Sequence, residues 1–478
     1  MPSLRHFTLA RGLDPAHWPF RGLCAGLLVI SIHLFVHPFP AQATNGTEQD
    51  SWALASGDTI GEPLGALLAE LLAEHPELQS ARHLTVAAQS AAEGAGALPD
   101  PVVGVGLSGL PLSELDISAE MMTMFEFEVM QDLLPRGLRD ARTEAAVARV
   151  AAADARERIV EWDLRLRLSE AWFDLLLVSE AIGVHDRTVS ALMAFSASAE
   201  VSYAEGVAPQ ADMLRAQTEL ASLEEHLAEL RRLRAAALAQ VNTLLGRAVR
   251  TPVPVSVPEG LRVLRAADPG MGMLTARLED AELGAGLPTL AELEALALLN
   301  RPELALRDAE LSVARAEAEV ARIERRPGIR LRGGYGLRSG RSDMISLGLS
   351  VPIPIFRSRK QDRWADAAAA EAEAEVHDRH ALQRTIQREV TEAHARLVEA
   401  REQLVLLEEG VLPQARATVR SSAAAYQAGE GSFTGLMEAQ TVLFRSEIQH
   451  AHLTAGLGQY LARLEWAVGF ALNPETDR

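Results

Sequence analysis

The chain carries the same set of sequence features twice, at a constant spacing. The residues that recur 223 positions later are Tyr203, Gly206, Ala216-Gln217-Thr218, Leu220 and Gly246, which return as Tyr426, Gly429, Ala439-Gln440-Thr441, Leu443 and Gly469. Self-similarity at a long, fixed period indicates a repeated supersecondary unit. We therefore predict two tandem copies of one unit, over 44–250 and 289–478, with 251–288 as the connection between them.

Each copy contains one pair of segments in which apolar and polar residues alternate with a period of two, over 102–131 and 329–354. The charged residues on the polar sides of these segments are Glu126, Glu128, Arg330 and Arg332. Such alternation predicts strands, and four strands of roughly 9 to 11 residues with one apolar face match the tilted strands of a membrane β-barrel. A soluble sheet with one buried face is the alternative interpretation.

Long helical patterns follow each pair of strands, and we expect helical hairpins over 137–246 and 358–470. No proline interrupts the chain from Gly137 to Ala204. At 1.5 Å per residue, a continuous helix there would reach ~100 Å, which is too long for the core of a compact domain. Gly410 and Pro413 are expected to kink the corresponding helix of the second copy.

Residues 1–43 have the pattern of a secretory signal peptide. Arginines precede an apolar run at 23–36, which ends before the small-residue pattern Ala41-Gln42-Ala43. No later stretch approaches the ~18 apolar residues of a transmembrane helix, so we expect any membrane crossing to use strands. The only cysteine, Cys24, lies inside this segment. We therefore expect neither a disulfide nor a lipid anchor after processing.

Charge and motifs exclude several functions. The net charge is −19, and it becomes −21 without the signal segment, which carries three arginines and one aspartate. A strongly acidic chain is a poor nucleic-acid partner. The phosphate-binding GxxxxGK[ST], metalloprotease HExxH and nucleophile GxSxG motifs are absent from the sequence. We predict a protein that is not an enzyme and uses no cofactor.

Four strands cannot close a barrel, and open strand edges in lipid leave backbone polar groups unsatisfied. Two chains would give eight strands, a barrel filled by its own side chains, and three chains would give twelve, with room for a passage. We predict the trimer. The expected fold is therefore mainly α with membrane β: a trimeric 12-stranded β-barrel continued by a long α-helical coiled-coil tunnel.

These features resemble the TolC family of outer-membrane efflux channels over nearly the whole chain after the signal segment. The resemblance lies in the tandem strand hairpins and in the matched turn sequences YAEGVAPQADML at 203–214 and YQAGEGSFTGLM at 426–437. Within the family, the sequences LPDPVVGVGLSGLPL and MTMFEFEVMQDLLPRGLRDAR look like the heavy-metal efflux branch of the CzcC and CusC type.

The resemblance implies a homotrimer in outer-membrane lipid of a Gram-negative bacterium, with its helical tunnel in the periplasm. It also implies two partners, a periplasmic adaptor (membrane fusion) protein and an inner-membrane pump of the resistance-nodulation-division (RND) type. The expected function is passive export of heavy-metal cations. Two alternatives remain open: the same architecture serving drug efflux or type I protein secretion, and a periplasmic coiled-coil adaptor.

The turns at Gly206 and Gly429 would form the periplasmic tips of the channel. The resemblance places entrance acids just past the second tip, where the matching positions are Gly435 and Glu438, and the first copy has Asp212 and Arg215 at the corresponding site. We expect Asp212 and Glu438 to line the entrance and to favour cations, because like carboxylates around one axis concentrate negative potential. Ordinary exposed carboxylates near helix N-termini are the alternative.

The charges of the strands should face the barrel lumen, because arginine on the lipid side costs ~2 to 4 kcal/mol near the midplane. Glu126, Glu128, Arg330 and Arg332 would either line a weakly selective passage or neutralise each other across neighbouring strands. His377 and His380 have a spacing that can chelate a metal, and Met121, Met122, Met124 and Met130 could contact a soft metal. A solvated helix face and packing explain these residues better, and we assign no metal ligand.

Overall fold

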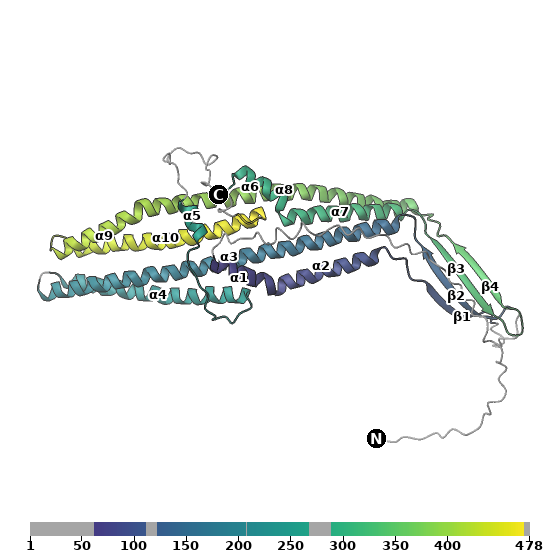
Figure 1. Ribbon diagram of the computed structural model, residues 1–478, viewed down its shortest axis with the longest axis horizontal. Helices are drawn as coiled ribbons and strands as arrows, with labels where there is room; N and C mark the ends of the chain where they lie inside the picture. The colour runs from purple at the N-terminus through teal and green to yellow at the C-terminus, as the bar shows by residue number, and fades with distance from the viewer. Residues whose placement is uncertain (1–61, 111–121, 207, 267–287, 473–478) are drawn as a thin grey trace, which may run out of the picture. The chain divides into compact units, whose positions relative to one another are not determined.

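A computed structural model describes residues 62–110, 122–206, 208–266 and 288–472. The expected signal segment, Met121 and most of the loop between the first two strands lie outside these residues. The first copy consists of α1 (Glu62–Glu74), α2 (Pro76–Ala95), β1 (Val102–Ser108), β2 (Met124–Leu133), α3 (Leu138–Ala204) and α4 (Gln210–Leu244) (Figure 1).

The second copy repeats this order (Figure 1). Its elements are α6 (Leu290–Asn300), α7 (Pro302–Ile323), β3 (Ile329–Leu337), β4 (Met344–Ser350), the short 3-10 turn η2 (Arg357–Arg359), α8 (Gln361–Leu406), the π-helical segment η3 (Leu407–Val411), α9 (Leu412–Gln427) and α10 (Phe433–Val468). The succession α8, η3 and α9 takes the place of the single helix α3. The prediction of two structural repeats is confirmed.

The recurring glycines have a common conformational role. Gly206 and Gly429 follow α3 and α9 with φ of 76° and 73°, and Gly246 and Gly469 follow α4 and α10 with φ of 65° and 69°. A left-handed residue after a helix satisfies its last carbonyl groups, and glycine adopts this conformation without steric cost. The repeated glycines therefore end equivalent helices of the two copies.

The irregularity expected near Gly410 and Pro413 is a π-helical segment. Pro413 has no N–H, so a regular α-helical hydrogen bond cannot form at that point. The backbone widens over Leu407–Val411 and α9 begins directly after it. In α3, which lacks an internal proline, all 67 residues form one uninterrupted helix.

The four strands form one antiparallel sheet in the order β1-β2-β3-β4. The central pair, β2 and β3, comes from different copies and runs in register from Phe125 opposite Leu337 to Leu133 opposite Ile329. Among the described residues, the outer strands β1 and β4 each pair with one strand. The two repeats are thus joined through hydrogen bonds between their hairpins.

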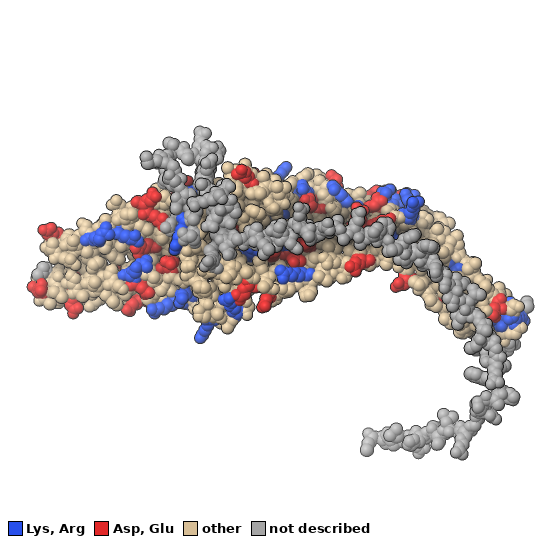
Figure 2. Space-filling model, in the orientation of Figure 1, with Lys and Arg blue, Asp and Glu red and all other residues tan. Residues whose placement is uncertain are grey.

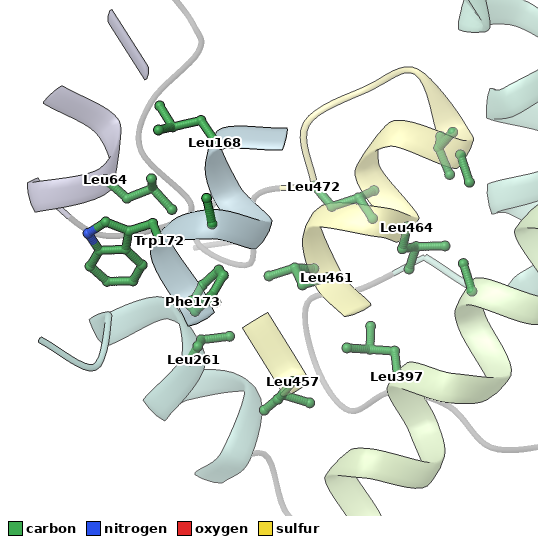
Figure 3. Packing of buried hydrophobic residues seen from close by; sticks show 14 of the residues in the cluster. Leu64, Leu168, Trp172, Phe173, Leu261, Leu397, Leu457, Leu461, Leu464 and Leu472 are labelled. Atoms are coloured by element: carbon green, nitrogen blue, oxygen red, sulfur yellow. The ribbon is translucent and has the colours of Figure 1, made fainter. Parts of the chain in front are cut away.

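The largest hydrophobic core joins helices of both copies (Figure 3). Trp172 and Phe173 of α3 are fully buried and pack with leucines of α1, α8 and α10, among them Leu64, Leu397 and Leu461. Gly458 of α10 allows this approach, since a Cβ there would lie 2.2 Å from the Phe173 ring.

The connection at 251–288 contains a helix that the sequence analysis missed. The helix α5 (Glu259–Ala266) buries Leu261 and Leu264 in the same core. Figure 3 shows Leu261 in this cluster. The eight residues of α5 are too few to give a clear helical period between the surrounding prolines and glycines. None of the helices within the described residues is both long and apolar enough to cross a membrane.

Candidate functional site

The sheet exposes its apolar face. Ile345, Leu347 and Leu349 of β4 are 75%, 87% and 67% exposed, and the Phe125 and Phe127 rings of β2 are also exposed. The alternative interpretation of the sequence, a soluble sheet, requires this face to be buried against other elements. The structure does not bury it. Because exposed apolar patches of this kind mark a protein or membrane contact, the face needs a non-aqueous neighbour.

The opposite face holds the charges that the sequence analysis selected. Glu126, Glu128, Arg330 and Arg332 lie at alternate positions of β2 and β3 and therefore share one face of the sheet. Arg332 forms an ion pair with Glu128. This pair is the cross-strand neutralisation that the sequence analysis considered.

Arg330 has a different partner, which the sequence analysis did not identify. Its Nε and Nη2 donate to the two carboxylate oxygens of Asp132 at 2.6 and 3.0 Å, a bidentate arrangement. The register places Asp132 directly opposite Arg330. The acidic residue could have been found only by fixing this register, because Asp132 lies at the end of the strand pattern.

Glycines flank the two glutamates on the neighbouring strands. Glu128 lies between Gly104 and Gly334, and Glu126 lies between Gly106 and Gly336. A Cβ at Gly104 would lie 2.8 Å from Cγ of Glu128, and a Cβ at Gly334 would lie 3.2 Å from Oε1 of Glu126. The glycines therefore provide the space in which the carboxylates lie along the sheet. Glu126 makes no ion pair with any residue that the structure describes.

The two helical tips pack together at the ends of their hairpins. Phe433, Leu436 and Met437 at the start of α10 form a buried cluster with Ala199 of α3 and Ala216 of α4. Across this cluster Arg215 Nη1 donates a hydrogen bond to the Thr434 hydroxyl. The tips beyond Gly206 and Gly429 are thereby joined.

Of the two expected entrance acids, Asp212 lies in the first turn of α4 and Glu438 lies in the second turn of α10. Asp212 is half-buried in α4 and Glu438 is exposed in α10. Neither carboxylate forms an ion pair within the described part of the chain. Burial, together with the nearby Asp212 carboxylate, raises the pKa of the Tyr426 phenol. The tip thus combines an apolar centre with two carboxylates that are not neutralised.

A charged network that the sequence analysis missed connects the hairpins further along. Glu447 of α10 pairs with Arg416 of α9 at 3.1 Å and with Arg187 of α3 at 3.7 Å. One turn away, His450 Nε2 lies 2.6 Å from Glu408 of η3. The partners are 31 to 260 residues apart in sequence, so no local pattern could have indicated them.

The possible metal-binding residues are not clustered. His377 is exposed and lies 4.0 Å from Glu373 on the same helix. Met124 and Met130 lie on the polar face of β2. The Met124 sulfur occupies the place that a side chain at position 336 would need, since a Cβ on Gly336 would lie 2.5 Å from it. Within the described residues, no group of three or more His, Cys, Asp or Glu side chains could hold a metal ion.

A four-stranded sheet with an exposed apolar face, continued by two long helical hairpins, defines a subunit of an outer-membrane channel. The chain belongs to the outer membrane efflux protein family, whose model matches residues 67–247 and 293–469. The expected family and fold class are therefore confirmed. Proteins of this family are channels and not enzymes, so the chain is not an enzyme.

Similar proteins include a metal-resistance protein and several solved channels. The cobalt-zinc-cadmium resistance protein CzcC of Cupriavidus metallidurans is 24% identical over 316 residues, which are 66% of this chain and 69% of CzcC. The crystal structure of CusC has a TM-score of 0.70 at 19% identity and covers 86% of this chain and 93% of its own. The outer membrane protein VceC of Vibrio cholerae has a TM-score of 0.68 at 16% identity, with 86% and 96% covered.

Proposed function

We propose that this chain is the channel subunit of a tripartite RND-type efflux system and exports heavy-metal cations across the outer membrane. The observation that carries the proposal is the sheet, which exposes an apolar face and places five charged residues on the other. Lipid is the neighbour that such a face requires, and water must lie on the charged side.

The outer strands support a trimer. β1 and β4 are the edges of the four-stranded sheet. Backbone groups on these edges need partners in a bilayer, and the edge strands of two further copies would supply them in a closed barrel of twelve strands. The helical hairpins of the three copies would continue as the periplasmic tunnel. In each chain, residues 1–43 would be a removed signal, 44–250 and 289–478 the two repeats, and 251–288 the connection between them.

The charges support a preference for cations. Glu128 and Arg332 neutralise each other, as do Asp132 and Arg330, so Glu126 contributes the uncompensated charge of the sheet. At the tips, Asp212 and Glu438 add negative potential around the proposed axis. The similarity to CzcC supports metal cations as the substrate, delivered by an RND pump through a periplasmic adaptor.

Deletion of the gene tests the substrate. We expect the deletion strain to lose growth on cobalt, zinc, cadmium, copper or silver salts while its growth on dyes and antibiotics is unchanged. Sensitivity to dyes and antibiotics alone would instead assign the channel to drug efflux, and loss of a secreted polypeptide would assign it to type I secretion.

Single-channel recordings test the lining. We expect Glu126→Gln and Glu438→Gln each to reduce the cation preference of the reconstituted channel. Glu128→Gln, which leaves Arg332 unpaired, changes the net charge of the sheet by the same amount as Glu126→Gln and should reduce the preference to a similar degree. An unchanged cation preference in the Glu438→Gln channel would remove that residue from the entrance.

A further inference from the structure

The apolar face of β4 continues beyond the end of the strand. Pro352 and Pro354 alternate with Val351, Ile353 and Ile355, and proline fixes φ near −65°. The Ile355 N–H donates to the Ile353 carbonyl at 2.9 Å, so the chain turns at Pro354. Ile353 and Ile355 are 80% and 78% exposed. The chain therefore presents a stiff apolar edge at the place where the sheet meets the helices.

Basic residues gather where this edge ends. The segments 325–326 and 357–366 contain six basic and two acidic residues, in a chain whose net charge is −19. Asp362 pairs with Arg325 and Arg357 at 3.4 and 3.2 Å, and Asp366 pairs with Arg363 at 3.3 Å. The three remaining cations, Arg326, Arg359 and Lys360, form no ion pair among the residues that the structure describes. Arg326 interacts electrostatically with the Glu319 carboxylate, which pairs with Arg322. Figure 2 shows basic side chains near the junction of the helices with the sheet.

Two aromatic side chains lie among these cations. Phe356 is 65% exposed and Trp364 is 57% exposed. The ammonium group of Lys360 lies 5.0 Å from the centre of the Trp364 ring. Tryptophan and lysine with this exposure are typical of the boundary between hydrocarbon and water, where the ring and the charge both lie at the level of the lipid headgroups.

A groove adjoins the same residues. It has a volume of about 810 Å³ and is lined by Arg326, Ile353, Ile355, Phe356 and Lys360, among others. The lining combines these apolar side chains with Arg326 and Lys360, and its carboxylates, Glu324 and Asp132, are paired with Arg142 and Arg330. This combination matches a phospholipid, whose acyl chain and anionic phosphate are covalently joined.

We propose that this surface, formed by Arg326, Phe356, Arg359, Lys360 and Trp364, binds the headgroups of anionic phospholipids in the periplasmic leaflet of the outer membrane. The inference rests on the proposed function, because that function places the apolar face of the sheet in the bilayer. The apolar edge is continuous with this face, so the polar boundary of the bilayer falls at Phe356. Uncompensated cations at that level attract anionic headgroups.

Quenching of tryptophan by brominated lipid tests the proposal. The full-length processed chain is reconstituted in vesicles of equimolar phosphatidylcholine and phosphatidylglycerol, with bromine near the headgroup end of the acyl chains of one lipid or the other. The contribution of Trp364 is the difference in fluorescence quenching between the wild type and Trp364→Phe. We expect brominated phosphatidylglycerol to quench Trp364 more strongly than brominated phosphatidylcholine does.

Neutral variants identify the groups responsible. Each basic residue near an anionic surface contributes about five-fold in affinity, so Arg326→Gln, Arg359→Gln and Lys360→Gln combined should reduce the preference for phosphatidylglycerol by at least about ten-fold. A variant with the same net charge, Arg231→Gln, Arg234→Gln and Arg420→Gln combined, changes exposed residues of α4 and α9 and should keep the preference.

Two results would overturn the inference, and they are distinguishable. Equal quenching of Trp364 by both lipids, or a preference that survives the neutral variant, shows that the sheet enters the bilayer without a specific headgroup site. The absence of quenching by either lipid shows that the sheet is not in the bilayer, and it overturns the proposed function together with the inference.

Discussion

The guanidinium group of Arg301 lies against the indole ring of Trp466, with Cζ 3.9 Å from the ring centre. Its Nη1 also donates to the carbonyl oxygens of Trp466 and Ala467 at 3.2 and 2.8 Å, and its Nη2 donates to Glu389 at 3.0 Å. Arg301 occupies the position that His75 has in the first copy. One buried side chain thus joins the start of α7 to α8 and to the end of α10.

Replacement of this arginine should strongly destabilise the chain. Arg301→Gln leaves Glu389 and two buried carbonyl groups without their partner, and we expect the free energy of unfolding to fall by about 3 to 5 kcal/mol. Urea denaturation of the detergent-solubilised protein, followed by circular dichroism, measures the change. The control is Arg307→Gln, whose half-exposed ion pairs should contribute less than about 1 kcal/mol. Equal effects of the two substitutions would contradict the assigned role of Arg301.

A buried carboxyl group should make stability depend on pH. Burial raises the pKa of Glu465 to about 8, although the carboxyl accepts a hydrogen bond from the Leu472 N–H at 3.0 Å. Between the unfolded value of about 4.3 and 8, the folded chain holds a proton that the unfolded chain has lost. The contribution of Glu465 to the free energy of unfolding therefore falls as pH rises from about 4.3 to about 8, and it is constant above pH 8.

Glu465→Gln removes this dependence. We expect the variant to be more stable than the wild type at pH 8, and the difference should shrink as pH falls and disappear below the unfolded pKa of about 4.3. Denaturation curves of both proteins across this pH range provide the measurement. Parallel pH profiles would mean that Glu465 does not hold its proton in the folded state.

Adjacent positions of β4 should respond oppositely to arginine. Leu347→Arg places a charge on the exposed apolar face, at a cost of ~2 to 4 kcal/mol if that position lies near the bilayer midplane, and should prevent assembly in the outer membrane. Ser346→Arg is the matched control on the polar face and should still assemble. Membrane fractionation and heat-modifiable migration in gels measure both. Normal assembly of Leu347→Arg would show that the face does not contact lipid.

The hydrogen bond between the tips should restrain the entrance. Arg215→Ala removes the donor to Thr434 and leaves the apolar cluster of the tips intact. We expect a larger mean single-channel conductance, because the population shifts toward tips that are further apart. Arg231→Ala, an exposed residue of α4, should have no effect. A conductance equal to that of the wild type in Arg215→Ala would mean that this bond does not hold the tips together.

The sequence by itself determined the repeat, the alternation of the strands and the positions of the helix-ending glycines. These features depend on residues that are close in the chain or on a constant offset, as with Gly206 and Gly429. The same local patterns placed Glu126 and Glu128 opposite to Phe125 and Phe127 on the sheet, because strand periodicity fixes the face of each residue.

Only the tertiary structure decided which charges neutralise each other and what lies in the core. The register of β2 and β3 places Asp132 opposite Arg330. The packing of α10 on α3 brings Glu447 to Arg187, which lies 260 residues earlier in the chain. The short helix α5 obtained its stability from the burial of Leu261 and Leu264 among helices of both copies. Such contacts depend on the free energy of packing between distant segments, which no local pattern encodes.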